Sequence, residues 1–440
     1  MEPIDEWSVD ANEALTLSLH SPTSGKQLTT FHPKYTYPIF GESETIFGYR
    51  NLNVRLAFAA DNMAMCVDVN WTEQKKPVGE VVAENITETL KEYLPAEAFE
   101  KDLEGFEASL PNRKTNKPFA PPGTFLTSSQ IGSKTYEIWT TTVDDPACKV
   151  LLANIQILVL LYIEGGSYIE LDDEEWSNKR WKIFFLYEKS EHAGYSFIGY
   201  STVYSYYYFS STLKDLSRAR ISQFLILPPY QRHGHGSRFY DALIKHYLAS
   251  ETTLEITVED PSESFSDLRD LRDLHRLETS GVFNKLTLQS VAAHTFQHED
   301  IRKAAKMPQR QFNRCLEMAL LKGLLEREKK EKRKQADRKR DKQWKIYRLV
   351  VKGRVYKQNR DVLAQLDRLE RIDKLEETYF HVEDDYKRLL DIARHGRIEE
   401  DESSANGKKA GRSKRNTDME EDEEMEEMEM GVRPKKRVRI

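Results

Sequence analysis

The order of apolar and polar residues divides the chain into a strand-rich first part, a dense middle and a helix-rich last part. Short β-type runs broken by Pro and Gly fill residues 1 to about 135, where residues 53–58 alternate as a half-buried strand does. Residues 137–141 predict another strand. The apolar run at residues 150–163 predicts a buried helix, since a membrane span requires roughly 20 residues.

Apolar and aromatic residues are densest in the middle of the chain. Strand patterns occur in WKIFFLYEKS, YSFIGYSTVYSYYYF, ARISQFLILPPY and LEITVE, and the helical pattern SRFYDALIKHYLAS lies between the last two. Because a strand–helix–strand crossover joins parallel strands, residues 221–227 and 254–258 are expected to be parallel neighbours.

The last third is helical in pattern and then loses its apolar positions. Residues 267–395 include DLRDLRDLHRL, with Leu at every third position, and the amphipathic QRQFNRCLEMALLKGLLERE. From residue 396 onward the apolar pattern stops; nine of the twelve residues 418–429 are acidic and five of the seven residues 433–439 are basic. Such a segment buries too little surface to offset chain entropy, so we expect residues 396–440 to form a disordered tail.

These patterns predict a mixed α/β (α+β) protein in four parts. An N-terminal α/β domain covers residues 1–135, and a core with a mixed sheet covers residues 136–275. A helical domain follows at residues 276–395, and the charged tail completes the chain.

Composition narrows the class of protein. The formal net charge is −6, which excludes a simple polycation that coats nucleic acid. Cys66, Cys148 and Cys315 lie far apart without a CxxC motif, which excludes a disulfide scaffold or a cysteine-rich zinc module and fits a reducing compartment. The first residues are acidic and lack the apolar stretch of a signal peptide, so we expect a soluble intracellular protein without membrane contact.

Two basic stretches suggest partners or targeting. Residues 327–345 contain eleven Lys or Arg and four acidic residues. They either contact nucleic acid or an acidic protein, or form a solvated helix face. Residues 433–437 resemble a nuclear-import signal.

The loop at residues 231–236 contains two glycines and lies between a predicted strand and a predicted helix. This arrangement predicts anion binding. A helix N-terminus carries unpaired N–H groups and a partial positive charge, and glycines allow a phosphate to approach the backbone. The sequence does not fit a P-loop, because no Lys-Ser or Lys-Thr follows Gly236. It does not fit a dinucleotide fingerprint either, because Phe239 stands where the third glycine would be.

The loop matches Q/R-x-x-G-x-G/A and resembles the acetyl-CoA pyrophosphate loop of the GCN5-related N-acetyltransferases. Longer segments are similar to the catalytic subunit of the type B histone acetyltransferases: SQFLILPPYQRHGHG, EITVEDPSE, FGESETIFGY and YSTVYSYYY. The resemblance covers about residues 30 to 350 in order, and it identifies the core as an acetyltransferase fold.

The resemblance implies that acetyl-CoA lies between two splayed parallel strands. Backbone groups of Phe224, Leu225 and Ile226 would meet the pantetheine, although the same residues fit a plain core strand. Ser262 would lie near the cofactor. The diphosphate would be held by the loop residues Gln231, Arg232, His233, Gly234, His235, Gly236 and Ser237. No metal is expected, because His233 and His235 lack further ligands nearby.

Acetyl transfer to lysine requires a base, because a lysine amine has a pKa near 10.4. Glu259 follows the parallel strand at the end where ligands bind in such sheets, and the family's general base falls on it. The alternative is an acidic turn in which Asp260 or Ser262 caps a helix. Glu164 is a second candidate and Asp260 a weaker third. The cysteines offer no convincing nucleophile, so we expect direct attack in a ternary complex.

The resemblance also implies how a basic histone tail is held. Contacts with the tail of histone H4 map onto Glu42, Ser43 and Glu44, and onto Trp181, Tyr204, Ser205 and Tyr206. Tyr204, Tyr206 and Tyr208 share one face of a strand. The alternatives are a solvated turn for the acidic residues and ordinary core for the aromatic ones.

The family implies acetylation of lysine ε-amines on free, newly synthesised histone H4, with histone H3 as a bystander. It also implies a WD-repeat histone chaperone as partner and residence in both cytoplasm and nucleus. Two other functions stay open: acetylation of another amine, such as a protein N-terminus or a small amine, and a non-catalytic chromatin adaptor.

Overall fold

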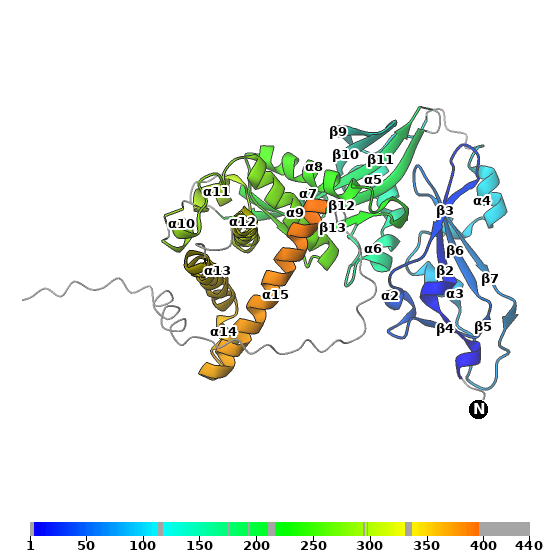
Figure 1. Cartoon of the computed structure of the whole chain (residues 1–440). Coiled ribbons are helices and arrows are strands. Elements are labelled where there is room, and N and C mark those ends of the chain that lie inside the picture. Colours follow the sequence, from blue (N-terminus) through cyan, green and yellow to red (C-terminus); the bar gives the residue numbers. More distant parts are fainter. Residues whose placement is uncertain are drawn as a thin grey trace, which may run out of the picture. The chain divides into compact units, whose positions relative to one another are not determined.

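A computed structural model describes residues 4–112, 118–173, 177–191, 194–209, 216–293, 295–296, 298–330 and 337–395 (Figure 1). The chain divides into two compact units, Met1–Phe265 and Ser266–Ile440. The first unit holds the strands and the second is helical, as the sequence pattern predicts. The tail expected at residues 396–440 lies outside the described residues.

A sheet near the N-terminus has the strand order β3-β2-β6-β7. Its strands are β2 (Leu15–His20), β3 (Gln27–Phe31), β6 (Asn53–Ala59) and β7 (Met65–Asn70). The strand predicted at residues 53–58 is confirmed as β6, but it is not half-buried as expected. Its second half is buried on both faces, because Ala57 packs against Phe106 of α4 (Leu103–Ser109).

Short elements surround this sheet. They are η1 (Ile4–Trp7), β1 (Ser8–Asp10), α1 (Ala11–Ala14), α2 (Tyr37–Phe40), β4 (Thr45–Phe47), β5 (Tyr49–Arg50), β8 (Glu73–Gln74), α3 (Ile86–Lys91) and η2 (Ala96–Phe99).

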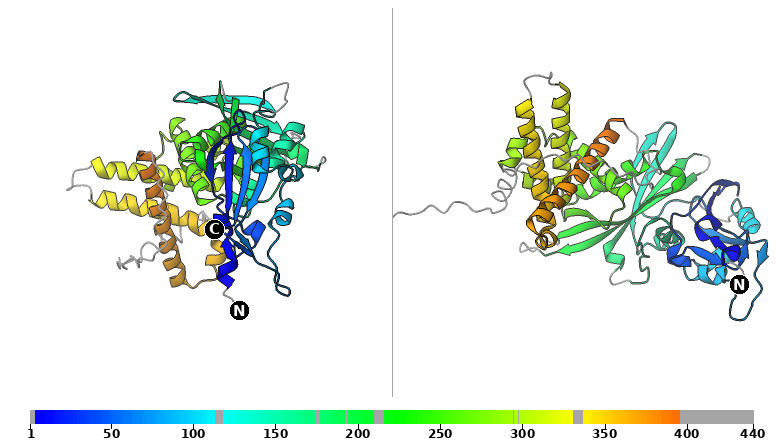
Figure 2. Two further views of the ribbon diagram at one scale, coloured as in Figure 1. Left: turned by 90° about the vertical axis from the view of Figure 1, so that its right-hand side faces the viewer. Right: turned by 60° about the horizontal axis from the view of Figure 1, so that its bottom comes forward.

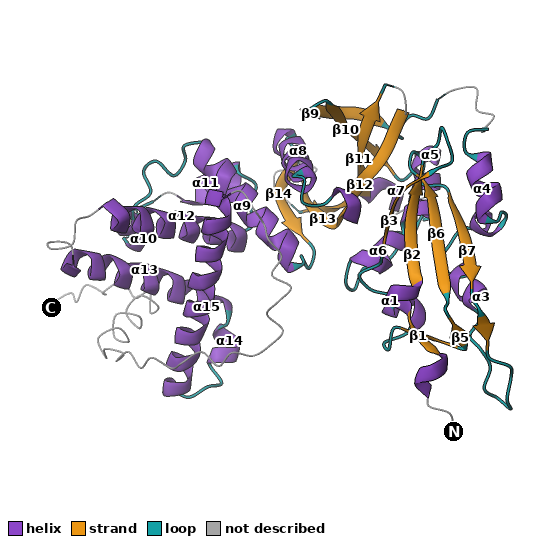
Figure 3. Cartoon of the chain, turned by 45° about the vertical axis from the view of Figure 1, so that its right-hand side comes forward, coloured by secondary structure: helices purple, strands orange, loops and turns teal. Residues whose placement is uncertain are grey.

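The larger sheet has the strand order β14-β13-β12-β11-β10-β9 (Figure 3). Its strands are β9 (Thr124–Ile131), β10 (Lys134–Thr142), β11 (Trp181–Ser190), β12 (Gly194–Tyr208), β13 (Leu216–Ile226) and β14 (Thr253–Val258). Neighbours are antiparallel except β13 and β14, which are parallel and joined through α8 (His235–Ala249). The predicted strands and their parallel pairing are therefore confirmed, and the sheet is mixed.

The predicted buried helix is two helices. α5 (Pro146–Ile155) and α6 (Ile157–Tyr162) meet at Gln156, whose Oε1 accepts a hydrogen bond from Ile169 N at 2.5 Å. Val150 is 65 % exposed, whereas all of α6 up to Leu161 is buried. These helices belong to one apolar core with residues of both sheets. Within the described residues, no helix is both long and apolar enough to cross a membrane.

The second unit consists of packed helices. Its elements are α9 (Glu263–Thr279), α10 (Leu288–Ala292), α11 (His298–Ala304), α12 (Gln309–Lys330), α13 (Asp337–Gln358), α14 (Arg360–Leu363) and α15 (Arg368–His395). α12 and α13 lie side by side and α15 crosses them (Figure 2). The basic stretch at 327–345 covers the end of α12 and the start of α13, with residues 331–336 outside the described part.

A buried charge joins these three helices. Glu317 on α12 accepts from Arg354 Nε on α13 at 2.6 Å and from the hydroxyl of Tyr386 on α15 at 2.8 Å. Burial raises the pKa of Glu317, and the Arg354 guanidinium opposes that rise. Because the pair is buried, removing one partner costs more than removing a surface charge.

We predict that Glu317→Gln destabilises the protein by about 3 kcal/mol, because it leaves the Arg354 guanidinium buried without a counter-charge. Calorimetric unfolding of the full chain measures this loss. Glu328→Gln, at an exposed position on α12, is the control and should change stability by less than about 0.5 kcal/mol. Equal midpoints for the two variants would contradict the prediction.

Candidate active site

The two parallel strands of the larger sheet separate at Ile221. Pairing between β13 and β14 ends where Ile221 stands opposite Val258, and the N–H of Glu259 makes the last hydrogen bond, to Ile221 O at 2.9 Å. Beyond this point β13 continues to Ile226, paired with β12 alone among the described strands. The register shifts there, because Gln223 pairs with Thr202 and Ile221 with Val203, which leaves Ser222 as a bulge.

This separation leaves one backbone edge of β13 open at the residues predicted to meet pantetheine. Their side chains serve the core at the same time: Leu225 and Ile226 are buried, and the Phe224 ring lies 5.1 Å from that of Phe239. Core packing and a backbone contact with a ligand are therefore compatible. The pantetheine contact itself stays a prediction.

The loop after β13 has the shape that an anion requires. The 3₁₀ helix η3 (Pro228–Tyr230) leads into Gln231, whose Nε2 donates to Ile226 O at 2.8 Å and ties the loop to the strand. Arg232 and Gly234 have φ angles of 65° and 76°. Gly234 is the N-cap of α8 and has no side chain that could cap the first-turn N–H groups of Gly236 and Ser237. A diphosphate fits such an uncapped helix N-terminus.

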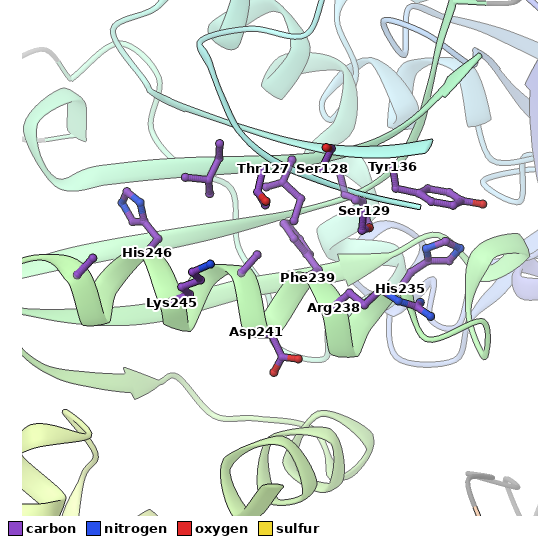
Figure 4. A pocket seen from close by; sticks show the side chains of 15 residues that line it. Thr127, Ser128, Ser129, Tyr136, His235, Arg238, Phe239, Asp241, Lys245 and His246 are labelled. Carbon is purple, nitrogen blue, oxygen red and sulfur yellow. The ribbon is translucent and has the colours of Figure 1, made fainter. Parts of the chain in front are cut away.

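The two loop histidines differ in environment. His233 is exposed, whereas the His235 side chain is buried against the Tyr136 ring at 4.5 Å. Burial lowers the pKa of His235, and the Arg238 guanidinium lowers it further. The His235 ring points into a cavity of about 430 Å³ between α8 and strands β9 to β11 (Figure 4). Within the described residues no three His, Cys, Asp or Glu side chains are grouped to hold a metal.

The predicted base lies among the predicted substrate aromatics. Glu259 Oε1 is 3.0 Å from Arg220 Nη1, and the Arg220 guanidinium lies 4.6 Å from the Tyr206 ring. The Tyr204 ring is 5.0 Å from that of Tyr206 and 4.9 Å from that of Trp181. Burial, helped by Glu259, raises the pKa of Tyr206.

Trp181, Tyr204 and Tyr206 are half-buried, and Trp181 also packs against the apolar core, so a contact with substrate stays a prediction for all three. Ser205 alternates with Tyr204 and Tyr206 and so faces the other side of β12. Sequence analysis missed Arg220. Its place depends on the register that sets it opposite Tyr204, and a cross-strand register cannot be read from a single strand.

Glu164 lies on an exposed turn that is fastened to β13. The N–H of Gly165 donates to the Tyr37 hydroxyl at 3.0 Å, and the buried Gln223 donates through Nε2 to Ser167 O at 2.8 Å. Gln223 thus holds this turn against the strand at the bulge. Sequence analysis missed Gln223 as well, since an amide in a strand pattern carries no distinguishing signal.

Asp260 and Ser262 form the turn that begins α9. Asp260 is exposed and has a φ of 28°, and Ser262 Oγ accepts from Phe265 N at 3.3 Å. Ser262 therefore caps the helix, as the structural alternative predicts. Its proximity to a cofactor stays a prediction.

In the acidic loop the three predicted contacts have different surroundings. Glu44 Oε1 accepts from the backbone N–H groups of Thr36 at 2.6 Å and Tyr37 at 3.1 Å, at the start of α2. These hydrogen bonds hold the pKa of Glu44 below its usual value. Glu42 and Ser43 are exposed, and Ser43 bonds to Thr45 at 2.9 Å. Glu42 thus presents its charge to solvent, while that of Glu44 stabilises the loop.

Comparison with known proteins places this geometry in a family. A model described as "Histone acetyl transferase HAT1 N-terminus" matches residues 7–164, and one described as "Fungal HAT1, C-terminal" matches residues 270–324. A solved aminoglycoside acetyltransferase from a soil metagenome aligns with 29 % of this chain and 78 % of its own at 16 % identity, and its TM-score of 0.22 is too low to carry a conclusion.

Three fungal relatives are each named "Histone acetyltransferase type B catalytic subunit". The protein of Aspergillus oryzae is 33 % identical over 88 % of this chain and 86 % of its own. That of Pyricularia oryzae is 37 % identical over 89 % and 93 %, and that of Schizosaccharomyces pombe is 34 % identical over 89 % and 94 %. With this identity over most of its length, the chain belongs to the family of type B histone acetyltransferase catalytic subunits and is an acetyltransferase.

Proposed function

We propose that this enzyme transfers the acetyl group of acetyl-CoA to lysine ε-amines in the N-terminal tail of free histone H4. Membership of the family supports histone acetylation in general. The observation that carries the finer proposal is the position of Glu259, at the point where β13 and β14 separate and beside the half-buried rings of Tyr204 and Tyr206. A carboxylate and aromatic rings suit an extended cationic tail.

Glu259 is the proposed general base. Bringing a lysine amine from a pKa near 10.4 to its neutral form at pH 7 costs about 4.6 kcal/mol. The Glu259 carboxylate takes the amine proton, directly or through a water, while the amine nitrogen bonds to the acetyl carbonyl carbon. The carbon–sulfur bond then breaks, and coenzyme A leaves as the thiolate. Arg220, 3.0 Å from Glu259, favours a neutral amine over a second cation at this place.

Direct attack in a ternary complex is favoured by the state of the thiols. Cys66, Cys148 and Cys315 are all buried. Burial raises the pKa of each, to about 11 for Cys66, so little nucleophilic thiolate is present at neutral pH. An acetyl-cysteine intermediate is therefore not part of the proposal.

Binding of acetyl-CoA is assigned to the open edge of β13 and the loop that follows it. Backbone groups at Phe224, Leu225 and Ile226 orient the pantetheine, and the N–H groups at the start of α8 hold the diphosphate. Acetyl-CoA supplies the activated acetyl thioester. The exposed Glu42 and the ring of Trp181 are the further contacts proposed for the histone tail.

The family resemblance is the support for three further proposals. A WD-repeat histone chaperone is the proposed partner, and histone H3 accompanies H4 without being the substrate. The enzyme works in both cytoplasm and nucleus. For residues 327–345 two alternatives stay open: a contact with nucleic acid or an acidic chaperone, and a solvated helix face.

A histone H4 tail peptide with a blocked α-amine tests the substrate. Incubated with the enzyme and acetyl-CoA, it should gain one or two acetyl groups on lysine side chains, as measured by mass spectrometry. An unmodified peptide, with acetyl-CoA bound in calorimetry, would overturn H4 as sufficient substrate and favour another amine. An enzyme that binds no acetyl-CoA would reject the cofactor assignment too.

Glu259→Gln should lower kcat by about 10²- to 10⁴-fold and leave acetyl-CoA affinity within a factor of about two, because it removes the base and leaves the loop intact. The matched control is Glu255→Gln. Glu255 lies on β14 with its own arginine partner, Arg218, at 3.1 Å, and its loss should leave kcat nearly unchanged. Near-normal turnover of Glu259→Gln across pH 6–9, with a loss in Glu164→Gln, would move the role to Glu164.

Gly234→Val should weaken acetyl-CoA binding, because Gly234 has a φ of 76° and an added Cβ would stand 2.8 Å from Arg238 Nη1. The strain costs about 1–3 kcal/mol and distorts the loop. Gly132→Val, also at positive φ but with nothing within 4 Å of its Cβ, should cost similar stability and leave acetyl-CoA affinity intact. Calorimetric titration compares the acetyl-CoA affinities of the two variants. Equal affinities would contradict the role of the loop in binding the cofactor.

A further inference from the structure

The cavity of about 430 Å³ follows α8 along the side that faces β9 to β11 (Figure 4). Its lining on the helix extends from His235 to Ala249, which is a length of about 20 Å along the helix axis. The strand order places β9 to β11 away from the edge where β13 and β14 separate. The volume is within the roughly 300–1,000 Å³ of small-molecule pockets, and no step of the proposed acetyl transfer uses this cavity.

The walls of this cavity are mostly apolar. They include Leu126 of β9, Ile138 of β10, Leu186 of β11, and Phe239 and Ala242 of α8. When an apolar group enters such a space, the water that it displaces from these walls gives a gain in free energy. The walls therefore favour a ligand with an apolar body over a small inorganic ion.

One buried polar side chain faces this cavity without a partner from the protein. His235 is only 6 % exposed, and its ring lies 4.5 Å from that of Tyr136 and 6.3 Å from that of His233. Within the described part of the chain, neither ring nitrogen of His235 makes a hydrogen bond. Because a buried polar group without a hydrogen bond costs free energy, this ring indicates a hydrogen-bonding partner from outside the chain.

The charged side chains of the lining favour an anionic partner. Arg238 lies beside His235 at one end of the cavity, and Lys245 and His246 lie toward the other end (Figure 4). Asp241 is the acidic residue among the described lining residues, and it points away from the strands (Figure 4). The groups that reach the cavity are therefore hydrogen-bond donors and cations, which match a carboxylate in charge.

We propose that this cavity binds a medium-chain carboxylate, with its carboxylate at His235 and its aliphatic chain along Phe239 and Ala242. The carboxylate accepts a hydrogen bond from the imidazole N–H, and Arg238 supplies a counter-charge at the same end. The His235 end is assigned to the carboxylate because Lys245, at the other end, is exposed and already solvated. Between Arg238 and Lys245 the helix advances about 10 Å, which accommodates a chain on the order of eight carbons.

Calorimetric titration of the full chain with octanoate tests the proposal. One octanoate should bind per chain, about tenfold more tightly than hexanoate, because two further methylenes are buried. The neutral 1-octanol should bind about tenfold more weakly than octanoate, because it lacks the charged acceptor. Octanoate should still bind when coenzyme A is present at saturation. Loss of octanoate binding under that condition would assign the cavity to the cofactor and overturn the proposal.

Two variants separate the apolar wall from the polar end. Ala242→Phe should abolish octanoate binding, because the added ring fills the cavity. Ala108→Phe, at an exposed position on α4, is the matched control and should bind octanoate as the unsubstituted protein does. His235→Phe keeps a ring but removes the hydrogen bond, so it should lose most of the preference for octanoate over 1-octanol.

Three results would contradict the proposal. An unsubstituted protein that binds no octanoate would leave water as the partner of His235. Octanoate binding that is unchanged in Ala242→Phe would place the ligand elsewhere on the protein. A preference for octanoate over 1-octanol that persists in His235→Phe would remove His235 as the group that meets the carboxylate. Thermal unfolding of each variant confirms that a loss of binding is measured on folded protein.

Discussion

The candidate site depends on the point where backbone hydrogen bonding between β13 and β14 ends. The hydrogen bond from Glu259 N to Ile221 O is the last between β13 and β14, and the bulge at Ser222 follows at once. A bulge turns a strand away from its neighbours and leaves its residues differently paired. Because β13 continues beside β12 alone, its backbone groups are available on one side, while the side chain of Glu259 stands at the opening.

The surroundings of this opening come from distant parts of the first unit. Gln223 fastens the turn of Glu164 to the bulge, and the Tyr37 hydroxyl accepts from the same turn at Gly165. Tyr37 begins α2, which Glu44 stabilises by accepting from backbone N–H groups. The acidic loop and the turn of Glu164 are thus fixed through one continuous set of hydrogen bonds, and a single apolar core lies beneath them.

Charge is distributed unevenly around the site. Glu259 is paired with Arg220, which in turn lies over Tyr206, whereas Arg238 at the start of α8 donates to the His233 carbonyl. One arginine thereby partly neutralises the carboxylate that is the proposed base, and the other adds positive charge to a helix N-terminus. In the helical unit the buried Glu317 is matched by Arg354 and Tyr386.

The sequence by itself determined the elements and much of the chemistry. The spacing of apolar residues and the turn residues identified α8 and the strands of the larger sheet, because these signals are local. The order of these elements then predicted the parallel pairing. The glycine loop and Glu259 could be proposed from sequence because each adjoins a strand or helix end that chain order alone defines. Local signals did not determine the break at Gln156, where the side chain accepts a hydrogen bond from Ile169 N, or the second buried face of β6, which packs against α4. Tertiary structure also decided the positions of Arg220 and Gln223, because cross-strand register and side-chain contacts depend on residues far away in sequence.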